Sequence, residues 1–203
     1  LPQDRYAEQK LEFFRLIEVR FEGSEHIVKS LDLLRPLARA GNKDAQTFLG
    51  NRLFEMRDLE SVQEGLAVFR ARAEAGGEDE VRDFAFALTH YGDRKQLKEG
   101  NDIYRPWAEE GDEDAQTEIA EALIKLGDKE SLEEAASFLD ILDIGEDDEV
   151  TCLHVEVLMK LGKKDDLEAA IPLLQHLVAV NWDESVRGTL DECQRRLATL
   201  TRL

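Results

Sequence analysis

Residues 114–145, DAQTEIAEALIKLGDKESLEEAASFLDILDIG, decide the fold because most of the chain repeats their pattern. Apolar residues recur at helical spacing on both sides of Gly127-Asp128, which predicts two amphipathic helices joined by a short turn. Steps of 35 residues from Leu132 meet an aliphatic residue each time, at Leu97, Val62, Ile27 and Leu167. A repeat of this length is typical of helical solenoids, in which each unit packs on its neighbours.

Matched columns of large and small residues run through the repeats. The second helix of each pair has a large column at Leu34, Phe69, Tyr104, Leu139 and Leu174, and a small column at Ser30, Gly65, Gly100, Ala135 and Ala170. The first helices have a large column at Leu53, Leu88, Leu123 and Leu158, and a small column at Gly50, Ala85, Ala120 and Val155. Small residues let helices approach closely and large ones fill the space beside them, so these columns predict the core.

The connections between pairs also repeat their chemistry. Each begins with glycine and continues with polar or acidic residues: Gly41-Asn-Lys-Asp44, Gly77-Glu-Asp-Glu80, Gly111-Asp-Glu-Asp114 and Gly145-Glu-Asp-Asp148. We expect the glycine to end one helix in a left-handed conformation and the following side chains to cap the next helix. The acidic turns also suggest calcium loops, but they lack the alternating twelve-residue ligand pattern, so capping is the favoured interpretation.

These features predict an all-α solenoid of five antiparallel helix pairs followed by a capping helix at about residues 184–200. We expect a single domain, 1–203, with an N-terminal pair at 1–40, regular repeats at 41–181 and the cap at 182–203. The first helix is expected at residues 3–22.

The motif Leu49-Gly50-x-x-Leu53 followed by Gly65-x-x-x-Phe69-x-x-x-Ala73-x-x-Gly76 resembles the tetratricopeptide and Sel1-like repeat families, over residues 24–181. The resemblance implies a right-handed superhelix whose concave face is lined by the first helices and binds proteins or peptides. It also implies, by analogy with envelope-associated Sel1-like proteins, a periplasmic or cell-envelope location in preference to the cytoplasm.

That geometry implies a binding groove made of three neighbouring stripes on the first helices. An apolar stripe contains Val19, Phe54, Thr89, Ile124 and Met159; a second contains Arg20, Glu55, His90, Lys125 and Lys160; a third contains Asn51, Phe86, Glu121 and Glu156. The partner-binding residues predicted from these stripes are Asn51, Phe54, Glu55, Phe86, His90, Glu121, Ile124, Lys125, Met159 and Lys160. Phe54 and Phe86 are the expected aromatic anchors. The alternative is that the apolar stripe packs between adjacent helices.

The histidine and cysteine residues do not form the patterns of a metal site or a disulfide. No two of the four histidines share an i, i+4 spacing, and none lies in a zinc-type cluster with cysteine, so we predict no metal and no cofactor. His154 replaces an apolar residue of the repeat and is expected in the core. Cys152 and Cys193 fall at different heights of the register, which favours two free thiols over a disulfide.

The composition restricts the partner. With 45 acidic and 26 basic residues the formal charge is −19, which disfavours polyanions such as nucleic acid or an anionic membrane surface. Solubility of a long repeat array is the simplest interpretation of this acidity, with an acidic recognition surface as the alternative. No apolar run approaches the roughly 20 residues that span a bilayer, so direct membrane insertion is not expected.

The sequence has no phosphate-binding glycine loop, nucleophile elbow or catalytic triad context, so we predict that the protein is not an enzyme. The leading hypothesis is an adaptor that binds a protein or peptide partner in its concave groove. The alternative is a cell-envelope scaffold subunit of an exopolysaccharide-export or secretion complex.

Overall fold

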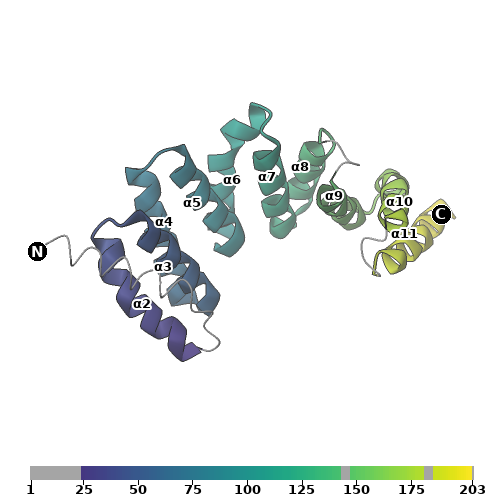
Figure 1. Ribbon diagram of the computed structural model, residues 1–203. Coiled ribbons are helices and arrows are strands. Elements are labelled where there is room, and N and C mark those ends of the chain that lie inside the picture. Colours follow the sequence, from purple (N-terminus) through teal and green to yellow (C-terminus); the bar gives the residue numbers. More distant parts are fainter. Residues whose placement is uncertain (1–23, 143–146, 181–184, 203) are drawn as a thin grey trace, which may run out of the picture. The chain divides into compact units, whose positions relative to one another are not determined.

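The computed structural model describes residues 24–142, 147–180 and 185–202, and every regular element in these ranges is an α-helix (Figure 1). The helices are α2 (Ser24–Arg39), α3 (Lys43–Met56), α4 (Leu59–Ala75), α5 (Glu78–Tyr91), α6 (Arg94–Glu109), α7 (Glu113–Leu126), α8 (Lys129–Leu139), α9 (Asp148–Leu161), α10 (Lys164–Ala179) and α11 (Ser185–Thr201). The helix expected at residues 3–22 lies outside the described residues.

The chain forms two compact units, Leu1–Phe84 and Ala85–Leu203. In the first unit α2 packs on α3, and α3 packs on α4. In the second unit each helix from α6 to α11 packs on the next, and α7 also contacts α9. Because α7 and α9 are the first helices of consecutive pairs, that contact joins one repeat to the next. The fold is therefore an all-α helical repeat of the α-solenoid type, as predicted.

The core lies where the repeat columns predict it. The large residues of both columns are buried: Leu34, Phe69, Tyr104, Leu139, Leu174, Leu53, Leu88, Leu123 and Leu158. Between α3 and α4 the glycines of the small columns face large aromatic side chains in both directions. A methyl group added at Gly65 would lie 2.7 Å from the Phe54 ring, and one at Gly50 would collide with the Phe69 ring. The two rings stack with centroids 5.8 Å apart, so each glycine makes room for the phenylalanine of the other helix.

The repeated turns cap the helices as expected. Side-chain oxygens of Asn42, Asp112 and Asp147 accept hydrogen bonds from main-chain N–H groups in the first turns of α3, α7 and α9, at 2.8 to 2.9 Å. Gly41 and Gly111 adopt the left-handed conformation, with φ of 84° and 94°.

The turn at Gly77 differs from those at Gly41 and Gly111, because Gly77 does not adopt the left-handed conformation that was expected there. Gly76 ends α4 in an extended conformation, and the Glu80 carboxylate accepts a hydrogen bond from the Gly77 N–H at 2.8 Å. The local spacing explains the change, because Gly77 follows Gly41 by 36 residues and precedes Gly111 by 34.

The last helix, α11, covers α10 with the buried side chains of Val186 and Cys193. The Cys193 thiol donates a hydrogen bond to the Leu167 carbonyl oxygen at 3.4 Å, and Cys152 and Cys193 are both free thiols. His154 is buried, with its Nε2 atom 3.2 Å from an Asp140 carboxylate oxygen. Within the described ranges, no helix is long and apolar enough to cross a membrane, and no three metal-ligating side chains form a group that could hold an ion.

Candidate functional site

The apolar stripe of the predicted groove belongs to the core. In the first unit Phe54 is 3% exposed; in the second, Thr89 and Ile124 are buried and Met159 is partly buried. These four side chains therefore face neighbouring helices, as the alternative interpretation of the stripe predicted. Val19 and Arg20, the first members of two of the stripes, lie outside the described residues. The prediction that Phe54 and Ile124 contact a partner was wrong, because both side chains are buried. The Phe54 ring fills the space beside Gly65, and Ile124 belongs to the hydrophobic core of the second unit.

The other two stripes lie at the surface. In the first unit Asn51 and Glu55 are exposed on α3, and Glu55 accepts a hydrogen bond from Arg52 at 2.6 Å. In the second unit Phe86 is 41% exposed, Lys125 and Lys160 are exposed, and His90 and Glu121 are partly buried.

The two lysines are also tied to the preceding repeat. Lys125 Nζ lies 3.5 Å from Glu121 and donates to the Thr89 carbonyl oxygen of α5 at 3.3 Å. One repeat later, Lys160 Nζ lies 2.8 Å from Glu156 and donates to the Ile124 carbonyl oxygen of α7 at 3.5 Å. Each lysine thus places its charge at the negative C-terminal end of the previous first helix. The predicted binding residues Lys125 and Lys160 therefore also join repeats.

Arg196 continues this pattern on α11. Its Nη1 atom donates to the Met159 carbonyl oxygen, near the end of α9, at 2.9 Å. We call Lys125, Lys160 and Arg196 the carbonyl-capping cations.

Five side chains of α5 and α7 converge next to the first of these cations. We name Phe86, His90, Glu118, Glu121 and Lys125 the His90 cluster. The Phe86 and His90 rings stack one helical turn apart, with centroids 3.9 Å apart. His90 Nδ1 lies 3.7 Å from Glu118, and His90 Nε2 lies 3.6 Å from Glu121. The cluster presents an exposed aromatic face beside two carboxyl groups of the neighbouring helix.

Two hydrogen bonds to one carbonyl group orient the α5 side of the cluster. The Thr89 hydroxyl lies 3.0 Å from the Phe86 carbonyl oxygen, and His90 Nδ1 lies 3.1 Å from the same oxygen. The Thr89 hydroxyl also lies 3.4 Å from a Glu118 carboxyl oxygen, which links α5 to α7. These contacts place the imidazole ring against Phe86 with its Nε2 edge toward Glu121.

The cluster shifts the pKa values of two of its members. Burial and the nearby Glu121 carboxylate raise the pKa of Glu118 from 4.5 to about 7, although Lys125 and Thr89 oppose them. Burial also lowers the pKa of His90, and the Lys125 ammonium lowers it further against the attraction of Glu121. Near neutral pH Glu118 is therefore only partly ionised and His90 is neutral. A positive charge bound beside the cluster would lower the pKa of Glu118, which would then release its proton.

Phe86, His90, Glu121 and Lys125 were predicted from the repeat register, but Glu118 was missed. Its contact with Thr89 spans 29 residues, as do the Arg35–Glu64 contact in the first unit and the Arg105–Glu134 contact in the second. An offset of 29 residues thus marks side chains that meet across adjacent repeats. Searching for polar pairs at that offset would have found Glu118.

Comparison with the solved structures finds the crystal structure of a de novo designed helical repeat protein, which is 16% identical to this chain. The match covers 100% of this chain and 96% of that chain, with a TM-score of 0.18. Models of known protein families and the curated proteins give no match. The assignment of the fold therefore rests on the helices and their packing.

Proposed function

We propose that this protein is a non-catalytic scaffold and that its His90 cluster binds a basic segment of a partner protein. The observation that carries the proposal is the exposed Phe86 ring, which stacks on the His90 ring beside two carboxyl groups. A guanidinium group that lies on the ring and faces Glu121 gains both a cation–π contact and a charge-assisted hydrogen bond. Arginine is suited to both contacts because its charged group is planar.

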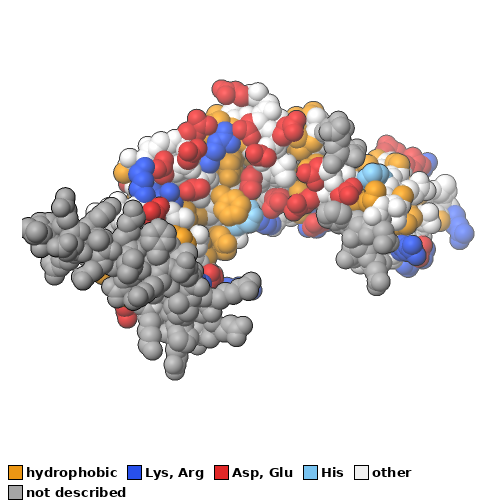
Figure 2. Space-filling view, viewed as in Figure 1, with side chains coloured by type: hydrophobic (Ala, Val, Ile, Leu, Met, Phe, Trp, Pro, Cys, Tyr) orange, Lys and Arg blue, Asp and Glu red, His pale blue; other side chains and the backbone are white. Residues whose placement is uncertain are grey.

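The wider surface supports a basic partner. Figure 2 shows many Asp and Glu side chains and few Lys or Arg side chains over α6 to α8 on the face in view. Together with the formal charge of −19, this surface attracts a basic segment over a distance of about one Debye length, roughly 8 Å at physiological salt. The general attraction speeds the encounter, and the His90 cluster supplies the specific contact.

The test must separate this contact from general attraction. The probe is a fluorescein-labelled, capped peptide with four arginines separated by Gly-Ser pairs, and the measurement is its dissociation constant by fluorescence anisotropy. Glu121→Gln is compared with Glu156→Gln, because Glu156 is the equivalent residue one repeat later and also has a lysine partner at i+4, Lys160 in place of Lys125. Both variants lose one negative charge.

We expect Glu121→Gln and Phe86→Ala to weaken binding about tenfold, and Glu156→Gln to weaken it less than about twofold. Binding should also strengthen from about pH 6 to about pH 8 as Glu118 ionises, and Glu118→Gln should flatten that dependence. If Glu121→Gln and Glu156→Gln weaken peptide binding equally, the interaction is explained by general electrostatic attraction alone, and the proposal is overturned.

A further inference from the structure

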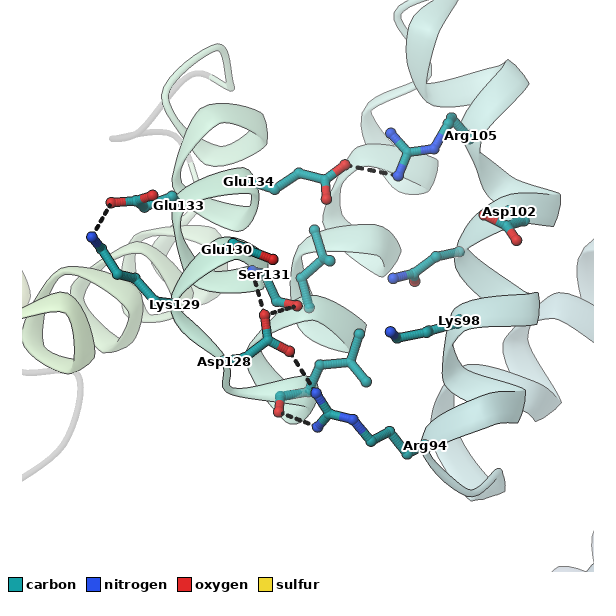
Figure 3. Close-up of a pocket in the computed structure, with 13 residues that line it drawn as sticks. Arg94, Lys98, Asp102, Arg105, Asp128, Lys129, Glu130, Ser131, Glu133 and Glu134 are labelled. Carbon is teal, nitrogen blue, oxygen red and sulfur yellow. Dashed lines mark hydrogen bonds and ion pairs between the residues drawn. The ribbon is translucent and has the colours of Figure 1, made fainter.

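A polar hollow of about 800 Å³ lies between α6 and α8, with Leu123 and Leu126 of α7 in its lining (Figure 3). Two ion pairs connect α6 with the α8 side of the hollow: Arg94 Nη2 lies 2.6 Å from Asp128, the N-cap residue of α8, and Arg105 Nη2 lies 2.7 Å from Glu134. Arg94 also donates to the Leu126 carbonyl oxygen at 2.8 Å. These contacts link the two walls of the hollow to each other.

Asn101 lines this hollow and is incompletely satisfied. The residue is 4% exposed, and among the described residues no donor reaches its Oδ1 atom. Leaving a buried acceptor unpaired is unfavourable, so such a group in a folded protein calls for an explanation. The equivalent residues one and two repeats earlier are Leu66 and Leu31, both buried. The fold accommodates leucine at this position, so the asparagine is not a requirement of the repeat.

Charged side chains of both signs line the same hollow, and two of them have no ion-pair partner among the described residues. Lys98 extends from α6 toward α8 (Figure 3), and within the described chain no carboxylate lies within ion-pair distance of its Nζ. On the opposite wall Glu130, in the first turn of α8, likewise has no cation partner there. A complementary ligand therefore offers an N–H donor to Asn101, an anionic group to Lys98 and a cationic group to Glu130.

We propose that this hollow binds an extended peptide segment that carries an acidic and a basic residue close together. A peptide main chain offers an N–H donor and a carbonyl acceptor, which match the acceptor and donor of the Asn101 amide. The acidic side chain pairs with Lys98 and the basic one with Glu130. The volume falls in the usual range for ligand sites, and the mixed charges of the walls favour a peptide of mixed charge. This site is separate from the His90 cluster and does not depend on the proposed function.

Nuclear magnetic resonance titration tests the site directly. The probes are capped glycine peptides that contain one Asp and one Lys, separated by one, two or three glycines, in both orders. The readout is the side-chain amide resonance of Asn101, identified by its absence in Asn101→Leu. This variant restores the leucine of the equivalent positions, so it should fold and be at least as stable as the wild type.

We expect at least one peptide to shift the Asn101 resonance saturably, with a dissociation constant of about 1 mM or tighter. Asn101→Leu and Lys98→Met should each weaken this binding at least about fivefold, as followed by the main-chain resonances of α6 and α8. Lys95→Met, on α6 but outside the lining, should leave it unchanged. No saturable shift with any peptide at about 10 mM would overturn the proposal. So would undiminished binding by Asn101→Leu, or an equal response to free lysine and glutamate.

Discussion

At the scale of single residues, Glu118 should make stability depend on pH. Its pKa is about 7 in the fold and 4.5 in its ordinary state, so between these values the folded chain holds a proton that the unfolded chain has released. The free energy of unfolding therefore decreases as pH rises from about 4.5 to 7, because the fold favours the protonated form of Glu118. We expect Glu118→Gln to exceed the wild type in unfolding free energy by about 1–3 kcal/mol at pH 8 and by much less at pH 4.5.

Urea unfolding of both proteins at the two pH values measures this difference. The comparison with Glu118→Gln is needed because His90 acts in the opposite sense. Its lowered pKa means that stability falls as pH drops below 6.5, and the two trends overlap in the wild type. Glu156→Gln controls for removing one charge from an acidic chain. A gain in Glu118→Gln that is the same at both pH values would contradict the raised pKa.

At the scale of helix pairs, the effect of Gly65→Ala on stability should change sign when the Phe54 ring that faces Gly65 is removed. Gly65→Ala places a methyl group 2.7 Å from the buried Phe54 ring and should destabilise the wild type by about 1–3 kcal/mol. Phe54→Ala should cost about 3–5 kcal/mol by leaving a cavity. In the Phe54→Ala background, however, Gly65→Ala should stabilise the protein, because alanine favours the helix and enters the empty space.

A double-mutant cycle by urea unfolding measures this coupling. Phe86→Ala is the matched control, since Phe86 is exposed and its loss should change stability by no more than about 0.5 kcal/mol. If Gly65→Ala destabilises both backgrounds equally, the two residues do not share the contact.

Between repeats, the carbonyl-capping cations should stabilise the stack. Lys160→Met removes a charge from the C-terminal end of α7 and should cost about 0.5–1 kcal/mol. Lys164→Met removes a similarly exposed lysine in the first turn of α10, whose ion-pair partner among the described residues is the i+4 carboxylate of Glu168 at 3.7 Å. A positive charge is unfavourable there, so its loss should cost nothing measurable. Equal costs in thermal unfolding would mean that the carbonyl contact contributes nothing.

At the scale of the whole molecule, the repeat period predicts which residues are equivalent more reliably than which way they face. The columns that contain Leu53 and Phe69 were placed in the core because both large and small residues recur at fixed positions. The column of Phe54 and Ile124 mixes apolar and polar types, so the sequence left open which way it faces, and the structure buries Phe54, Thr89 and Ile124. The roles proposed for Glu118 and Asn101 could not be predicted from the period alone. Glu118 was identified by its contact with Thr89 of the preceding repeat, and Asn101 by its buried, unpaired Oδ1 atom.

The net charge of −19 leads to a prediction for the entire chain. Even if every basic residue is paired, 19 carboxylates lack a partner of opposite sign, and their mutual repulsion favours expanded states. Many of the ion pairs are exposed i+4 or i+3 pairs, each of which contributes only about 0–1 kcal/mol to stability. Salt that screens these pairs therefore removes little stabilising energy. We expect the melting temperature to rise by about 2–5 °C between about 20 and 300 mM NaCl, while the basic peptide binds more weakly. A melting temperature that falls over the same range would show that the ion pairs between and within helices outweigh the repulsion.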